Sequence, residues 1–286
     1  MIRRITSRAA ATALLLSGLG FTAAAFGADP SRAPFDQPLQ VQHVTLNPHA
    51  TEPGEKKDIR CFSFPHFMVK EIDSGEVGDE QLSIIPLVSQ TQHLPCQATS
   101  LAGEQVIPVK TWSGYFLGVK GDYVFFSADD GVNGGMGFAV FHGAATASVF
   151  EDAVDIVHDH LQFHALTADA GGLRLRYARL YSGTCSVQTE GAACWAKLAA
   201  QTHLPVAPAP DCATGYLRAR HELAAGRCEA QSRGKDAACI AREMERERAE
   251  GDDSSPSVIT YEVEVVLRPA PAFTPLGGAM GCRPAD

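Results

Sequence analysis

The chain has 286 residues, of which 45% are hydrophobic and 20% are charged, and its formal net charge at pH 7 is −9. This composition supplies enough apolar side chains for a true core, which argues against a disordered tail or a mini-protein that depends on disulfides to fold. The negative charge argues against binding to nucleic acid or to an anionic lipid surface, since both require a basic surface. From the length we expect one domain, or one domain with an inserted lobe.

Residues 1–27 are predicted to be a secretory signal peptide, because a basic start, an apolar run and two small residues precede a cleavage site at Ala28. These parts are Arg3, Arg4 and Arg8, the run Ala9–Phe26, and Ala25 with Gly27. A membrane anchor is the alternative, and the modest hydrophobicity of the run and the Pro-rich segment that follows argue against it. We expect an exported protein, periplasmic or extracellular, with no transmembrane segment in the mature chain.

Cleavage would remove three arginines and no acidic residue, so 21 basic and 33 acidic residues would remain and the net charge would become −12. All eight cysteines lie in the mature part, and their even number in an oxidising compartment predicts four disulfides. A metal site is the alternative, but no CxxC spacing is present. Eight cysteines allow 105 pairings and the sequence alone does not select one. Locality suggests Cys61 with Cys96, Cys185 with Cys194 and Cys228 with Cys239, which leaves Cys212 for Cys282.

Residues 28–59 are rich in proline and polar side chains, and we expect a flexible N-terminal arm in which only Leu39–Leu46 can form a strand. Residues 60–190 are predicted to form a β domain, because short β-prone runs alternate with Gly, Asp and Ser. This spacing indicates an antiparallel sandwich, barrel or propeller-like sheet. The runs are Phe67–Ile72, Leu82–Val88, Gln105–Lys110, Tyr115–Val119, Tyr123–Ser127, Phe138–His142, Ala147–Phe150 and Leu173–Leu180.

Residues 191–252 are predicted to form an α-helical lobe, stapled by disulfides and inserted into the β domain. Its helical segments are Ala192–Gln201, Cys212–Gly226 and Lys235–Glu250. Asp211 is expected to be an N-cap, and Gly226 and Gly251 are expected to end helices. The mixed charges from Arg242 to Arg248 indicate a solvated helix face rather than a binding stripe.

Residues 253–286 are predicted to return to the β domain and to end in a C-terminal tail. The run Val258–Arg268 alternates between apolar and charged side chains, as Leu173–Leu180 also does. If the helical lobe is an insertion, these two runs should pair antiparallel. Arg174 and Arg176 should then face Glu262 and Glu264.

Two segments contain candidate metal ligands. Residues 127–135 combine carboxylates, an amide and glycines, as calcium loops do, but lack the later bidentate glutamate, and a hairpin turn explains the same residues. His158 and His160 would project from one face of a strand, close enough to share a metal such as zinc. In a helix, His160 and His164 would pair instead. A third ligand would have to come from elsewhere, with His66, His142 and Asp159 as candidates, and a solvated polar face is the alternative.

The aromatic side chains of the first half of the β region are expected to form a core rather than a binding platform. The chain contains no GxSxG or SxxK motif for a nucleophile. We therefore expect an exported, non-catalytic binding or envelope-associated protein of unknown ligand, without a cofactor. The alternative is a metal-dependent hydrolase that uses the His158/His160 pair. A binding protein requires an exposed apolar patch, whereas the hydrolase requires further ligands that converge on these histidines.

Overall fold

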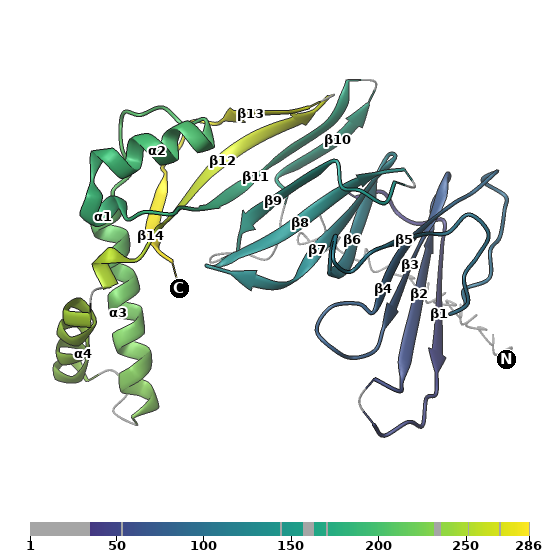
Figure 1. The fold of residues 1–286 in the computed structure, drawn as a ribbon, viewed down its shortest axis with the longest axis horizontal. Coiled ribbons are helices and arrows are strands. Elements are labelled where there is room, and N and C mark those ends of the chain that lie inside the picture. Colours follow the sequence, from purple (N-terminus) through teal and green to yellow (C-terminus); the bar gives the residue numbers. More distant parts are fainter. Residues whose placement is uncertain are drawn as a thin grey trace, which may run out of the picture. The chain divides into compact units, whose positions relative to one another are not determined.

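The computed structural model describes residues 35–52, 54–143, 145–156, 163–169, 171–231, 236–250, 252–268 and 270–285. The predicted signal peptide lies outside these residues. Within them the fold is β-rich, as predicted, with one five-stranded sheet, one nine-stranded sheet and a helical region (Figure 1). Neighbouring strands in both sheets are antiparallel.

The five-stranded sheet is a meander in which each strand pairs with the next one along the chain. Its strands are β1 (Gln40–Leu46), β2 (Lys57–Ser63), β3 (Phe67–Asp73), β4 (Gln81–Pro86) and β5 (Gln105–Ile107). The central strand β3 is buried on both faces, because one face meets the other sheet and a loop covers the opposite face.

The stretch Leu39–Leu46, the part of residues 28–59 that was expected to be able to form a strand, contains β1. β1 pairs with β2 along its whole length, from Gln40 opposite Ser63 to Leu46 opposite Lys57. The side chains of Val44 and Leu46 pack against a buried cluster on the outer face of the sheet. Apolar side chains at alternate positions are sufficient to hold an edge strand, although the flanking residues are polar.

The nine-stranded sheet has the order β13-β12-β11-β9-β8-β7-β6, with β10 also paired to β11 and β14 also paired to β12. Its strands are β6 (Gly114–Lys120), β7 (Tyr123–Val132), β8 (Gly135–His142), β9 (Phe150–Asp155), β10 (Ala165–Asp169), β11 (Gly172–Ser182), β12 (Ser257–Leu267), β13 (Pro271–Pro275) and β14 (Gly281–Pro284). Strands β10, β13 and β14 were not predicted, since each is short and carries little apolar alternation.

Part of the nine-stranded sheet packs against the five-stranded sheet, so this part of the fold is a β-sandwich. Val69 and Ile84 of the first sheet share a buried cluster with Val124, Phe126 and Phe141 of the second. Each fully buried side chain of this size contributes about 1.5–3 kcal/mol relative to its exposed state. Most of the aromatic residues expected in a core are buried here or in the neighbouring cluster, which confirms that expectation.

The helical region lies entirely between β11 and β12, which are neighbours in the sheet (Figure 1). It comprises α1 (Val187–Glu190), α2 (Ala192–Thr202), α3 (Cys212–Ala230), α4 (Ala237–Glu250) and the 3-10 turn η1 (Asp252–Ser254). Strands β11 and β12 pair antiparallel from Leu173 opposite Leu267 to Ser182 opposite Val258. In chain order, the helices are therefore an insertion between two paired strands, as the alternation predicted.

The charged side chains of β11 and β12 face each other as predicted. Arg174 Nη1 lies 2.5 Å from Glu264 Oε1, and Arg176 Nε lies 3.8 Å from Glu262 Oε2. On the other face Tyr177, Val263 and Val265 are fully buried. Burial determines the register, because exposed pairs of this kind contribute only about 0.2–1 kcal/mol each.

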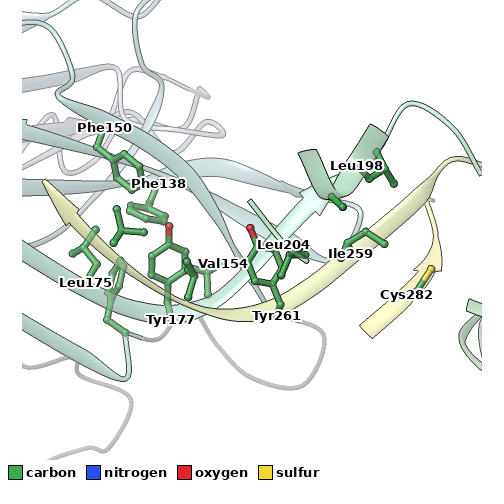
Figure 2. Close-up of a cluster of buried hydrophobic side chains, with 14 of the residues drawn as sticks. Phe138, Phe150, Val154, Leu175, Tyr177, Leu198, Leu204, Ile259, Tyr261 and Cys282 are labelled. Atoms are coloured by element: carbon green, nitrogen blue, oxygen red, sulfur yellow. The ribbon is translucent and has the colours of Figure 1, made fainter. Parts of the chain in front are cut away.

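A second buried cluster joins the inserted helices to the sheet (Figure 2). Leu198 of α2 and Leu204, which follows α2, lie beside Ile259 and Tyr261 of β12. The same cluster extends to Phe138 and Phe150. Helices α1 and α2 and the start of α3 are thus packed into the core of the β domain.

The helix ends agree with the sequence at Asp211 and differ at Gly226. The Asp211 side chain accepts a hydrogen bond from the Thr214 backbone N–H and caps α3. Helix α3 continues past Gly226 to Ala230, which carries Cys228 to its partner Cys239. Gly251, the other predicted helix end, lies outside the described residues.

The charged face of α4 is only partly solvated, which corrects the prediction for Arg242 to Arg248. Glu243 and Glu247 are 4% and 6% exposed. Glu247 pairs with Arg227 of α3, and Glu243 pairs with Arg246 one turn later on α4. The Arg227–Glu247 ion pair therefore contributes to the contact between α3 and α4, together with the Cys228–Cys239 disulfide.

Four disulfides join the eight cysteines, and the pairs are those expected from locality. They are Cys61–Cys96, Cys185–Cys194, Cys212–Cys282 and Cys228–Cys239. Their presence is consistent with an oxidising compartment.

Candidate binding groove

The predicted histidine pair falls where the structure gives no description, because His158, His160 and Asp159 lie outside the described residues. His164 is described, and its Nδ1 lies 3.0 Å from Glu262 Oε2 among the surface charges of β11 and β12. His142 contacts the ring of Tyr123 instead of a second histidine. Among the described residues, no group of three or more His, Cys, Asp or Glu side chains is placed to hold a metal ion.

The 127–135 segment forms a tight hairpin between β7 and β8, as the turn interpretation predicted, and its strands are longer than expected. Only Asn133 and Gly134 lie between the strands, with φ values of 54° and 68°. Two consecutive left-handed residues are typical of a type I′ turn. Asp129 accepts a hydrogen bond from the Ser113 hydroxyl at 3.0 Å, and Asp130 accepts one from the Gly131 N–H at 2.7 Å. These carboxylates therefore have local protein partners.

A buried polar cluster includes the hydroxyls of Tyr177 and Tyr261, two side chains of the core shown in Figure 2. Asp152 accepts hydrogen bonds from the Tyr177 hydroxyl at 2.5 Å and from Arg179 Nε at 3.0 Å. Arg179 also donates to the Tyr261 hydroxyl at 2.8 Å, and that hydroxyl donates to the Thr202 carbonyl at 3.0 Å. Burial raises the pKa of Asp152, and the positive charge of Arg179 opposes the shift. Because its members form hydrogen bonds with one another and with the Thr202 carbonyl, we interpret this cluster as a structural network.

A second buried polar group consists of the carboxyls of Glu71 and Asp79, which are 2% and 5% exposed. Burial raises the pKa of both groups, and the charge of Glu71 adds to the rise at Asp79, whose pKa is about 8. Sequence reasoning missed this pair, because Glu71 lies in an alternating strand and Asp79 lies in an acidic segment that resembles an ordinary loop.

A groove lies between α3 and the strand β14. It consists of two hollows of about 860 and 260 Å³ that share the lining residues Ala219, Glu222 and Arg283. The α3 side of the groove is lined by Gly215, Arg218, Ala219, Glu222, Leu223, Gly226, Arg227 and Ala230. The opposite side is lined by Asp155, Ser255, Thr260, Gly281, Cys282, Arg283, Pro284 and Ala285.

The position of α3 beside β14 follows from two residues at one end of the groove. A Cβ atom at Gly215 would lie 1.6 Å from the Cys282 carbonyl oxygen, so only glycine allows the helix to approach so closely. One turn earlier, the Cys212–Cys282 disulfide fixes the same crossing. Beyond this point the helix side chains Ala219, Leu223 and Ala230 line the open groove, and Leu223 is 48% exposed.

Arg283 fixes the opposite wall. Its Nη1 donates to the Asn133 carbonyl at 2.6 Å, and its Nη2 lies 3.3 Å from Asp155 Oδ1. Asn133 in turn donates to the Ser182 hydroxyl at 2.9 Å. The β7–β8 turn, the end of β9 and β14 are thereby joined, which makes this wall rigid. The groove could not be predicted from the sequence, because its two walls come from segments far apart in the chain.

No helix among the described residues combines the length and apolar character that a membrane crossing requires. Comparison of the chain with protein families, with curated proteins and with solved structures finds no match.

Proposed function

We propose that the protein is an exported, non-catalytic binding protein that holds an extended peptide segment of another protein in the groove between α3 and β14. The observation that supports this proposal is the groove itself, which has an apolar floor, polar groups on both walls and an exposed leucine. Its volume lies in the range of ligand sites in proteins.

The dimensions of the groove suit a short peptide. Its helical wall extends from Gly215 to Ala230. At a rise of 1.5 Å per residue this wall is about 22 Å long, which corresponds to about seven residues of extended chain.

The lining favours a peptide over a lipid chain. Polar side chains recur along the groove, with Arg218, Glu222 and Arg227 on the helix and Ser255, Thr260 and Arg283 opposite. A peptide backbone carries a donor and an acceptor at each residue and can bond to such groups, whereas a hydrocarbon chain can form no hydrogen bond with them.

Export is supported by two independent features. Residues 1–27 have the pattern of a cleavable signal peptide, and the four disulfides suit an oxidising compartment. N-terminal sequencing of the protein recovered from outside the cytoplasm should begin at Ala28.

The binding proposal is tested with a phage library of random heptapeptides panned against the chain from residue 28 onward. Selected peptides are synthesised with a fluorophore, and their affinity is measured by anisotropy. Ala219→Trp fills the floor of the groove and should weaken binding at least tenfold. Leu217→Trp is the matched control, because Leu217 is on the same helix, is 53% exposed and does not line the groove. The control should bind as the parent protein does.

The proposal is wrong if no peptide is enriched, or if enriched peptides bind the Ala219→Trp and Leu217→Trp variants equally well. Circular dichroism and thermal unfolding of both variants must match those of the parent. If Ala219→Trp misfolds, Glu222→Lys, which reverses a charge on an exposed groove side chain, takes its place with the same expected loss of binding.

A further inference from the structure

The carboxyl pair of Glu71 and Asp79 lies where the two sheets of the sandwich meet. Glu71 belongs to β3 of the five-stranded sheet, and its Oε2 accepts a hydrogen bond at 3.1 Å from the backbone N–H of Phe116 in β6. This bond connects the first sheet to a strand of the second. Glu71 Oε1 also lies 2.6 Å from Arg60 Nε on the neighbouring strand β2.

Asp79 attaches the segment of residues 74–80 to the same strand. The Asp79 backbone N–H donates to the Gly114 carbonyl at 2.9 Å, and the Gly78 N–H donates to the Tyr115 hydroxyl at 2.8 Å. The Asp79 side chain contacts Glu71. No N–H or O–H donor among the described residues reaches either of its carboxyl oxygens. Two carboxyls in contact are stable only when they share a proton, since two buried negative charges repel each other.

Arg60 is the cation beside the pair, and its charge is already used by other carboxylates, so it does not neutralise an ionised Asp79. Arg60 already pairs with Glu71 and lies 3.7 Å from Asp73 Oδ2. From the elements packed against Asp79, the other polar groups are the Tyr115 hydroxyl on β6 and Ser113 with Asp129, which bond to each other. Beside Asp79, Glu80 pairs with Lys57. An ionised Asp79 would therefore be a buried charge without its own cation.

We propose that this junction is a pH-sensitive closure, in which the proton shared by Asp79 and Glu71 holds the 74–80 segment against β6 and loss of that proton releases the segment. The raised pKa of Asp79, about 8, places the change just above neutral pH. Asp79 lines a hollow of about 400 Å³ together with Glu76, Val77, Glu80 and Val109, so water can reach the pair from the Asp79 side when the segment moves. Because an exported protein meets the pH of its surroundings, the closure would respond to an external signal.

The test is hydrogen exchange of the mature protein at pH 6.5 and pH 9.5, with rates corrected for intrinsic chemical exchange. The amides of Gly78 and Asp79 report directly, since both donate to β6 in the closed state. At pH 9.5, about 1.5 pH units above a pKa of 8, their protection should fall by up to about 30-fold. Amides at the centre of β12, such as that of Val263, should keep their protection.

Two variants separate this closure from general effects of pH. In Asp79→Asn the side-chain amide can donate to Glu71 at every pH, so protection of the two amides should be equal at pH 6.5 and pH 9.5. Asp129→Asn removes a neighbouring carboxylate that bonds to Ser113, and it should retain the loss at pH 9.5. The proposal is overturned if the parent protein keeps full protection at pH 9.5, if Asp79→Asn still loses protection, or if β12 amides lose protection to the same extent.

Discussion

The ion pair of Lys70 and Glu104 provides a demanding test of how the five-stranded sheet is stabilised. Lys70 lies on the outer face of β3, and Glu104 lies at the end of the 87–104 loop that covers this face. Lys70 Nζ is 2.7 Å from Glu104 Oε1, and both side chains are 0% exposed. The Cys61–Cys96 disulfide joins the same loop to β2. We predict that Glu104→Gln lowers the free energy of unfolding by about 3 kcal/mol, because an unpaired buried ammonium costs about 3–5 kcal/mol.

Glutamine is chosen at position 104 because it removes the negative charge of the glutamate and keeps nearly the same shape. Glu104 also accepts hydrogen bonds from the Leu101 backbone N–H at 2.7 Å and from Gln81 Nε2 at 2.9 Å, and the glutamine carbonyl can accept one of them. Adding Lys70→Met to Glu104→Gln removes the orphaned charge and should restore at least about half of the loss, since replacing a whole buried pair is often nearly neutral.

The measurement is equilibrium unfolding in guanidinium chloride with disulfides intact, followed by circular dichroism. Glu264→Gln is the control, because its partner Arg174 has a side chain that is 52% exposed, and breaking an exposed pair should cost no more than about 1 kcal/mol. The reasoning is refuted if Glu104→Gln lowers the free energy of unfolding by no more than Glu264→Gln does, or if adding Lys70→Met fails to restore part of the loss. Either result would mean that the Lys70 ammonium finds water or another partner in the Glu104→Gln variant.

Three further predictions concern other parts of the fold. Replacing Cys212 and Cys282 by serine opens a loop with a sequence separation of 70. It should lower the free energy of unfolding by about 4 kcal/mol on the chain-entropy estimate, and a loss below about 1 kcal/mol in denaturant titrations would contradict this. Because the pKa of Asp79 rises from 3.8 in the unfolded chain to about 8 in the fold, the folded state binds more protons between these values. The free energy of unfolding of the parent protein, relative to that of Asp79→Asn in the same buffers, should therefore decline by about 1.4 kcal/mol per pH unit as pH rises from 5 to 7.5. Asn133→Val should reduce the melting temperature, because a β-branched residue is disfavoured at positive φ, and an unchanged melting temperature would argue against the type I′ turn.

The elements that could be predicted from the sequence are those with local signals. The alternation in Leu173–Leu180 and Val258–Arg268 was enough to place two strands side by side across the helical insertion, with the facing charges in register. Locality suggested the disulfide pairs without selecting them, because partners close in sequence meet readily but many other pairings were possible, and Cys212–Cys282, with a sequence separation of 70, followed only by elimination. Helix α3 was predicted with its N-cap, but its end was not, since Gly226 lies in open space inside a helix that tertiary contacts extend.

The groove and the carboxyl pair depend on contacts between distant segments, which no local pattern reveals. Lys70 and Glu71 are adjacent and point to opposite faces of β3, and either would be expected to face solvent. Both are buried, because the 87–104 loop covers one face and strand β6 lies against the other. In the same way Arg283 gave no signal in the sequence, although it joins β14 to Asn133 and Asp155.

The helices are inserted between two paired strands, so the helical wall of the groove is encoded by one continuous segment that can change without changing the strands. Ser182 and Val258 already face each other across the ladder, so a short turn in place of residues 183–256 would leave a plain β-hairpin in the sheet. Variation in the inserted segment can therefore reshape the helical wall while the strand register stays the same, with Gly215 and Cys212 as the points that any replacement must reproduce to hold the helix against β14. A scaffold of this kind can acquire new ligand preferences by exchange of one continuous stretch of coding sequence.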